Sequence, residues 1–207
     1  MKSTLQILAI TILTFTFTFT AYADTSKKIY RGYVVTTKGD TLRGQIQMLT
    51  PTLNEVKVKF IASNGQKQTF KAKEVLAYSF IVPTHKKGNQ TITYSRKQVE
   101  NAPVPFGPKD VLVERQINGK ISLYNHYVET RAGQYAYNHF FLLEKDGKTV
   151  TINRENFKKA IKNAVADYPE LRAKVGKKGY GYKYIATIIK EYNRFNAPKG
   201  GEMLGLN

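Results

Sequence analysis

Apolar and polar residues alternate along most of the stretch from Lys28 to about Ile152. Residues 56 to 60, for example, read Val-Lys-Val-Lys-Phe, which puts the apolar side chains on one face and the lysines on the other. A period of two is typical of β-strands that bury one face. The stretch 28–152 is therefore predicted to be rich in β-strands.

Turn signals divide this stretch into short strands. Lys38-Gly39-Asp40, Asn64-Gly65, Asn118-Gly119 and Asp146-Gly147 supply residues that tolerate the positive φ of a tight hairpin. Between residues 101 and 110 three prolines, which cannot donate to a strand ladder, predict an exposed connector. The spacing predicts an antiparallel meander sheet, sandwich or open barrel of about eight to ten short strands.

Further along, the apolar period becomes helical, starting from a predicted N-cap at Asn153. The capping-box spacing from Asp167 to Glu170 predicts a second helix that ends at Gly176, and a third is expected over 182–195. The side chains expected to face inward are Phe157, Ala160, Ile161, Ala164, Val165, Ile185, Ile188, Ile189 and Tyr192. Amphipathic helices need an apolar partner, so these two or three are predicted to pack on the sheet and give a mainly β, α+β fold.

The first 23 residues have the three parts of a secretory signal peptide. Lys2 gives a positive start, Leu5 to Phe19 is apolar and rich in threonine, and Ala21-Tyr22-Ala23 places small residues before the cleavage point. The apolar part has about 15 residues, fewer than the roughly 20 that cross a bilayer. The sequence predicts a cleaved signal peptide at 1–23, no transmembrane helix, and export to the periplasm, the cell surface or the medium.

The mature chain of 184 residues has the usual size of one domain. We expect a single exported domain over 24–196, made of a β-rich part at 28–152 and a helical part at 153–196, with a flexible tail at 197–207. The chain contains no cysteine, which excludes disulfides, thiol nucleophiles, a lipid-modified N-terminal cysteine and thiolate metal sites.

The chain is strongly basic, with a formal net charge of +18 that becomes +17 once Lys2 is removed. Residues 24–152 hold 20 basic and 10 acidic side chains, and residues 153–199 hold 12 and 4. Such a charge favours association with polyanions, which outside the cytoplasm include lipopolysaccharide phosphates, acidic glycans and peptidoglycan carboxylates. The alternative is that the charge serves solubility only.

One loop combines ammonium groups with aromatic rings between flexible glycines. We call it the Lys/Tyr loop; its predicted binding residues are Lys177, Lys178, Tyr180, Tyr182, Lys183 and Tyr184. Lysines can pair with phosphates or carboxylates while tyrosines stack on flat rings. The competing interpretation is a solvated connector whose tyrosines pack back on the sheet.

Two near-repeats, Tyr124-Asn125-His126-Tyr127 and Tyr137-Asn138-His139-Phe140, suggest a hairpin that places His126 directly across from His139. The two imidazoles would then share one face, with Cβ atoms about 4.5–5.5 Å apart. A catalytic zinc site needs a third protein ligand, and His85 would have to come from another hairpin. A cross-strand ladder of aromatic and histidine rings is therefore the preferred interpretation, and no metal site is predicted.

No catalytic residue and no cofactor are predicted. The carboxylates of the β-rich part lie at turns or beside lysines, and their spacing does not indicate a converging acid and base pair; they are Asp40, Glu55, Glu74, Glu100, Asp110, Glu114, Glu129, Glu144 and Asp146. The mature serines occur in no Gly-x-Ser-x-Gly elbow, and the glycines of 176–181 form no phosphate-binding loop.

Several short motifs resemble those of uncharacterised exported proteins of Bacteroidota-type bacteria. They are Gly32-Tyr33-Val34-Val35, the run from Gly39 to Ile46, the Asn118-Gly119 hairpin leading to Leu123-Tyr124, and Glu191-Tyr192-Asn193. The resemblance implies a β-rich body and an envelope or secreted location, and it brings no activity with it.

Two functions of different classes are consistent with the sequence. The preferred hypothesis is an exported, non-enzymatic binding or structural module of the cell envelope that contacts an anionic partner such as lipopolysaccharide, an acidic glycan or peptidoglycan. The alternative is a small-ligand-binding β-barrel or an envelope hydrolase with the C-terminal helices as a lid. No specific nucleic acid is predicted as a partner.

Overall fold

The structure is a computed structural model that describes residues 28–84, 88–99, 110–130 and 137–197. The predicted signal peptide, most of the proline-rich connector, His85 and the predicted tail from Pro198 lie outside the described residues. In the described part, no helix is long and apolar enough to cross a membrane.

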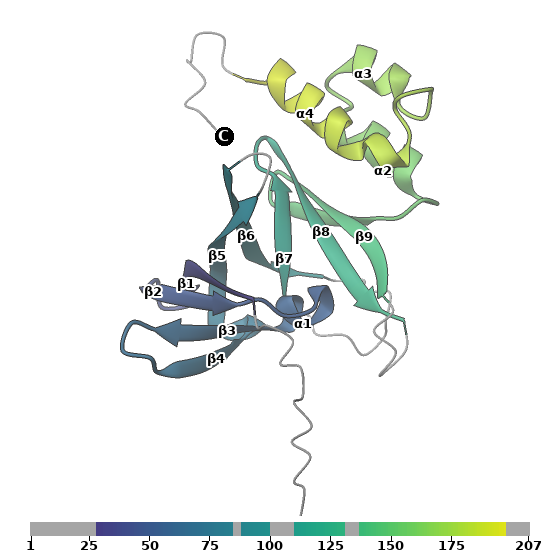
Figure 1. Ribbon diagram of the computed structural model, residues 1–207. Helices are drawn as coiled ribbons and strands as arrows, with labels where there is room; N and C mark the ends of the chain where they lie inside the picture. The colour runs from purple at the N-terminus through teal and green to yellow at the C-terminus, as the bar shows by residue number, and fades with distance from the viewer. Residues whose placement is uncertain (1–27, 85–87, 100–109, 131–136, 198–207) are drawn as a thin grey trace, which may run out of the picture.

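The described strands form one open, ten-stranded antiparallel sheet, as predicted (Figure 1). Their order is β10-β9-β8-β7-β6-β5-β1-β2-β3-β4, so β10 and β4 are the two edges. The first four strands are β1 (Ile29–Thr36), β2 (Thr41–Gln47), β3 (Lys57–Ala62) and β4 (Lys67–Lys71). The chain then returns through the short 3-10 helix η1 (Ala72–Glu74) and pairs β5 with β1. The remaining strands are β5 (Val75–Thr84), β6 (Gly88–Gln98), β7 (Asp110–Ile117), β8 (Ile121–Glu129), β9 (Tyr137–Lys145) and β10 (Lys148–Ile152).

The predicted hairpin turns lie between the paired strands. Gly39 and Gly65 have φ values of 90° and 82°, and both Asp146 and Gly147 have positive φ. Gly119 serves a different purpose, because a side chain there would collide with Asn193. Positive φ thus explains three of the turns, and close approach of a helix explains the fourth.

The C-terminal helices are α2 (Phe157–Ala164), α3 (Pro169–Lys174) and α4 (Ile185–Phe195), with the 3-10 turn η2 (Tyr182–Tyr184) before α4. They gather at one end of the molecule beside β7, β8 and β9 (Figure 1). Their apolar faces and the neighbouring strands share one core, whose fully buried members include Ile121, Leu123, Ile152, Ile161, Leu171, Ile188 and Tyr192. Packing of amphipathic helices on the sheet therefore agrees with the prediction.

Two predicted caps differ in the structure. Asn153 lies one turn before α2, and it exchanges hydrogen bonds with Asn156: each backbone N–H donates to the other side-chain Oδ1, at 2.9 and 2.8 Å. Asp167 does not cap α3. Its carboxylate accepts hydrogen bonds from the buried Tyr192 hydroxyl and from Lys120 and Lys145, which hold it against α4 and the sheet instead.

A short helix that the sequence pattern did not reveal, α1 (Pro51–Val56), lies in the curve of the sheet (Figure 1). It contacts β3 on one side and β7 and β8 on the other, although five strands separate β3 from β8 in the sheet. The sheet must therefore bend around α1. Six residues between two strands are too few to show a helical period, and Val56 continued the alternation of β3.

Helix α1 closes a gap between β7 and β8. The register between these strands runs from Ile117/Leu123 to Glu114/Asn125, and beyond that pair α1 contacts both strands. Glu55 accepts the backbone N–H of Tyr127 at 2.7 Å, and its other oxygen lies 2.7 Å from Nδ1 of His126. Glu55 and His126 are 2% and 4% exposed. A buried carboxylate thus takes the place of the missing strand neighbour.

Candidate anion-binding face

The exposed part of the Lys/Tyr loop consists of its lysines and Tyr184. Lys177, Lys178 and Lys183 are exposed, and Tyr184 is 38% exposed. The Nζ atom of Lys183 lies 4.9 Å from the centre of the Tyr184 ring, within the range of a cation–π contact. These four side chains remain available to a partner.

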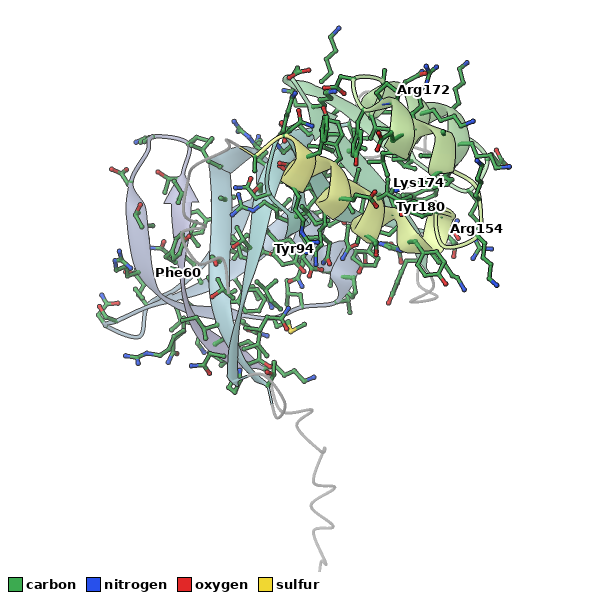
Figure 2. The ribbon with its side chains drawn as sticks, turned by 90° about the horizontal axis from the view of Figure 1, so that it is seen from above. Phe60, Tyr94, Arg154, Arg172, Lys174 and Tyr180 are labelled. Carbon is green, nitrogen blue, oxygen red and sulfur yellow. The ribbon has the colours of Figure 1, made fainter. Side chains whose placement is uncertain are left out.

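The other two tyrosines of the loop pack inward. The Tyr180 hydroxyl donates to Glu191 at 3.0 Å, and Lys174 lies beside the same ring, as Figure 2 shows in a view from above. Tyr182 packs between the rings of Phe141 and Phe157, at centroid distances of 5.5 and 5.9 Å. Both tyrosines therefore contribute to the helical core, which leaves this loop a single exposed ring for stacking.

The expected pairing of His126 with His139 is wrong by one residue. The register places His126 opposite Phe140 and Tyr127 opposite His139. Because neighbouring residues of a strand face opposite sides, the two imidazoles lie on opposite faces of the sheet. Among the described residues, no three histidine or carboxylate side chains converge to hold a metal ion.

Three carboxylates near the C-terminal helices bind lysines. Glu144 lies 2.6 Å from Lys97 and accepts the Tyr124 hydroxyl at 2.7 Å. Burial opposes ionisation of Glu144, but these hydrogen bonds outweigh it and hold its pKa below the usual value. Asp167 and Glu191 bind Lys145 and Lys174 in the same way, at 3.1 and 3.0 Å. These lysines are therefore neutralised locally, whereas the exposed lysines of α2 and of the Lys/Tyr loop form no such pair among the described residues.

A different distribution of charge is found on β1–β4. The residues of these strands that face away from the apolar core include six cations, which we call the basic face: Arg31, Arg43, Lys57, Lys59, Lys67 and Lys71. No aspartate or glutamate lies at the outward positions of these four strands. Arg31, Arg43, Lys67 and Lys71 are exposed, and Lys57 and Lys59 are half-buried. The six charges therefore add to one another, and a carboxylate lies close only at the end of β4, where Glu74 accepts the Lys71 backbone N–H at 2.7 Å.

Strand register brings the two arginines together. Arg31 lies opposite Gln45, and Tyr33 lies opposite Arg43, so the arginines are diagonal neighbours on adjacent strands. Such diagonal positions are about 7–8 Å apart, within reach of long side chains. Two guanidinium groups with an amide and a phenol between them can bind carboxylate or phosphate oxygens from two sides.

A groove of about 760 Å³ runs along this face. Its polar lining comes from Arg31, Arg43, Tyr33 and Gln45, and serines and Thr91 complete it. Apolar contacts come from Ile61 and Ile81, and Ile81 is 44% exposed. The volume is within the range of ordinary ligand sites, which are about 300–1,000 Å³.

Two paired glycines lie at the back of the groove. Gly32 and Gly44 are opposite each other in the β1–β2 register. A side chain at Gly32 would collide with the Ser79 carbonyl oxygen, and one at Gly44 would collide with the Ile61 carbonyl oxygen and the Phe60 ring. The strands approach too closely here for any residue with a Cβ atom, so the glycines permit the tight curvature of this part of the sheet.

Comparison of this chain with protein-family models, with curated proteins and with solved structures finds no match. The function is therefore inferred from the charge and the shape of the surface.

Only part of the basic face could be predicted from the sequence. Alternation already placed Lys57 and Lys59 on the outward side of their strand. Which side chains lie beside those lysines depends on the order of the strands, however. The cations of β1 and β4 come to the same face through strand pairing, which no local sequence pattern specifies.

Proposed function

We propose that this protein is an exported, non-enzymatic binding or structural module of the cell envelope, and that its basic face contacts an anionic partner. The single observation that carries the proposal is a sheet face with six cations and no carboxylate at its outward positions. The partner classes are those expected from the sequence: lipopolysaccharide, an acidic glycan or peptidoglycan. Export is the expectation from the predicted signal peptide.

The form of the face favours an extended polymer over a small ion. The six cations are spread over four strands, and neighbouring strands are about 4.8 Å apart. A single phosphate would reach only the arginine pair, whereas a chain with repeated charges can contact cations on several strands. The groove beside Arg31 and Arg43 would hold one unit of that chain.

The partners of four carboxylates support a binding role for the basic face over catalysis. Glu144, Asp167 and Glu191 hold lysines, and Glu55 is buried and bonded within the fold. A hydrolase that uses two carboxylates needs both beside a substrate cleft. The groove on the basic face has no carboxylate among its lining residues.

The test is co-sedimentation of the purified mature protein with isolated sacculi and with lipopolysaccharide across a salt series. The double variant Arg31→Gln/Arg43→Gln is compared with Lys159→Gln/Lys162→Gln, which removes the same charge from exposed positions of α2. We expect wild-type binding to fall steeply with salt. The arginine variant should weaken binding and reduce the salt slope by about 2, about 1 for each lost contact.

A third arm, Lys177→Gln/Lys178→Gln/Lys183→Gln, tests the Lys/Tyr loop as the site. If this variant loses binding and the arginine variant does not, the site belongs to the loop and the assignment to β1–β4 is wrong. Equal weakening by all three variants would mean that net charge alone attracts the polymer. No sedimentation at low salt would overturn the proposed function and direct attention to a small ligand in the groove.

A further inference from the structure

A row of aromatic side chains on β8 and β9 is left partly open on the face that carries α1 and the helical core. We call it the aromatic strip and define it as Tyr127, Tyr137, His139 and Phe141. Tyr137, His139 and Phe141 alternate along β9, and Tyr127 lies directly opposite His139 on β8. All four side chains therefore share one face of the sheet.

The rings of the strip contact one another in sequence. Tyr127 stacks on His139 with centroids 5.0 Å apart, and it meets Tyr137 edge to face at 5.2 Å. His139 meets Phe141 at 4.6 Å, and Phe141 continues to Tyr182 of the helical region. The helical core anchors one end of the row, and mutual contacts fix the orientation of the other rings.

The strip is more open than the opposite face of the same strand pair. In the strip, Tyr137 is 45% exposed, His139 is exposed, and Tyr127 and Phe141 are half-buried. On the other face, Asn138 is exposed but Tyr124, His126 and Leu142 are buried. Two exposed rings that continue into two half-buried ones form an aromatic surface open to water, and exposed surface of this kind marks interaction sites.

A line of hydrogen-bonding groups borders the rings. His139 Nε2 lies 3.0 Å from Asn125 Oδ1, and the Asn125 amide donates to Glu114 at 3.3 Å. Gln116 donates to the other Glu114 oxygen at 2.9 Å. Each of these amides and the carboxylate can form more hydrogen bonds than these, so donors and acceptors remain for a ligand.

The charge of the strip is opposite to that of the basic face. Two carboxylates lie at the strip: Glu114 borders it, and the exposed Glu129 lies directly opposite Tyr137. Burial, with a smaller effect of His126, lowers the pKa of His139, so this imidazole is neutral at pH 7. Burial and the Glu114 carboxylate together raise the pKa of Tyr127 to about 12, so its hydroxyl stays protonated. A polyanion would be repelled here.

We infer that the aromatic strip is a second binding site, and that it takes an uncharged glycan chain. Sugar rings present flat C–H faces that stack on aromatic rings, and their hydroxyl groups both donate and accept hydrogen bonds to amides and carboxylates. The site is independent of the basic face, because the two lie on different strands and on opposite faces of the sheet.

The test measures binding of the purified protein to a panel of soluble neutral polysaccharides, namely a β-glucan, a mannan, a galactan and dextran, by biolayer interferometry. The buffer contains about 1 M NaCl, which reduces the Debye length to about 3 Å and suppresses charge-driven binding. We expect at least one glycan to bind. Tyr137→Ala and His139→Ala should weaken it about tenfold each, as loss of a stacking ring does at other aromatic sites.

The control is Tyr184→Ala, which removes an exposed ring from η2 and should bind the glycan as wild type does. The variant Arg31→Gln/Arg43→Gln should also bind the glycan normally, so failure of this site and failure of the proposed function are distinguishable. The inference is wrong if no member of the panel binds, or if Tyr137→Ala and His139→Ala both retain full affinity while keeping the wild-type circular dichroism spectrum.

Discussion

The half of the sheet formed by β1–β4 and the half that carries the helices are both basic, yet they use their cations differently. In the helical half, Lys97, Lys145 and Lys174 bind carboxylates at 2.6–3.1 Å. In β1–β4, the outward positions carry six cations and no acid. Every lysine–carboxylate ion pair found among the described residues involves β6 or elements after it.

The difference shows that net charge is a poor guide to a binding surface. A cation beside a carboxylate contributes a contact to the fold, and its field at a distance is largely cancelled. A cation without a neighbour of opposite sign contributes little to stability, but its field extends to the Debye length, about 10 Å at 0.1 M salt. The two halves should therefore respond to different perturbations.

Helix α1 joins the two halves, so loss of Glu55 should have the largest effect on the whole molecule. Glu55→Ala leaves the Tyr127 N–H and the His126 ring without their buried partner, and we expect a loss of about 2–5 kcal/mol in unfolding free energy. Glu55→Gln can keep both hydrogen bonds and should lose much less. Urea denaturation of both variants is the measurement, and equal losses would show that the two hydrogen bonds that Gln can keep do not account for the stability contributed by Glu55.

Glu55 in α1 and Asp167 in the helical half should differ in the sign of their contribution to the pH dependence of stability. Burial raises the pKa of Glu55 above 4.5 despite the opposing bonds from His126 and Tyr127. The folded protein then holds this proton more tightly than the unfolded chain, so the site favours folding below pH 4.5, and that contribution is lost as the pH rises through the raised pKa.

Asp167 behaves oppositely. The hydrogen bond from Tyr192 is the largest influence, and with the bonds from Lys145 and Lys120 it lowers the pKa of Asp167 far below 3.8, against a smaller effect of burial. Its contribution is present above pH 3.8 and is lost as the pH falls. Relative to wild type, Glu55→Gln should therefore become more favourable as the pH rises from about 4 to 7, whereas Asp167→Asn should become less favourable as the pH rises from about 2 to 4; stability curves with the same sign would contradict this assignment.

A smaller effect, confined to β1–β4 and β5, is expected from Gly32→Ala. The new methyl group would meet the Ser79 carbonyl oxygen, Ile46 and Phe80, and overpacking of this kind costs about 1–3 kcal/mol. The matched control is Gly181→Ala, where φ is −87° and a Cβ atom would meet nothing within 4 Å. Hydrogen exchange should show the loss of protection first around β1 and β2. Equal tolerance of both substitutions would mean that curvature at Gly32 is unimportant.

The smallest predicted effect lies in the helical half. Tyr192→Phe removes the hydroxyl that donates to Asp167 at 2.7 Å while keeping the buried ring, and we expect a loss of about 1 kcal/mol. Tyr184→Phe, at an exposed ring, should change the unfolding free energy by less than about 0.5 kcal/mol. Thermal unfolding of both variants measures the two losses of unfolding free energy. A larger loss for Tyr184→Phe than for Tyr192→Phe would show that the hydrogen bond to Asp167 does not stabilise the helical half.

Local patterns predicted most of the fold. Alternation identified the strand segments, the glycine turns identified the hairpins, and the inward residues of α4, such as Ile188 and Tyr192, are buried as expected. Short-range patterns failed where a residue's role depends on distant partners. Asp167 has the spacing of a capping residue, yet Lys120, Lys145 and Tyr192 lie close enough to bind it.

The candidate sites were less predictable than the fold. The Lys/Tyr loop was visible in the sequence because its residues are adjacent, but Tyr180 and Tyr182 pack inward in the structure. The register between β8 and β9 differs by one residue from the expectation, which moves His139 to the face of Tyr127 and away from His126. A shift of one residue exchanges the two faces, and the near-repeat of Tyr-Asn-His could not fix it.

The sequence by itself determined where strands, turns and C-terminal helices form, because periodicity, glycine and proline act over a few residues. It also determined the net charge and the absence of cysteine chemistry. The tertiary structure alone decided which cations share a face, that Glu55 closes the gap between β7 and β8, and that the rings of β8 and β9 form one strip. These properties depend on strand order, register and the curvature around α1, which arise from contacts between residues far apart in the chain.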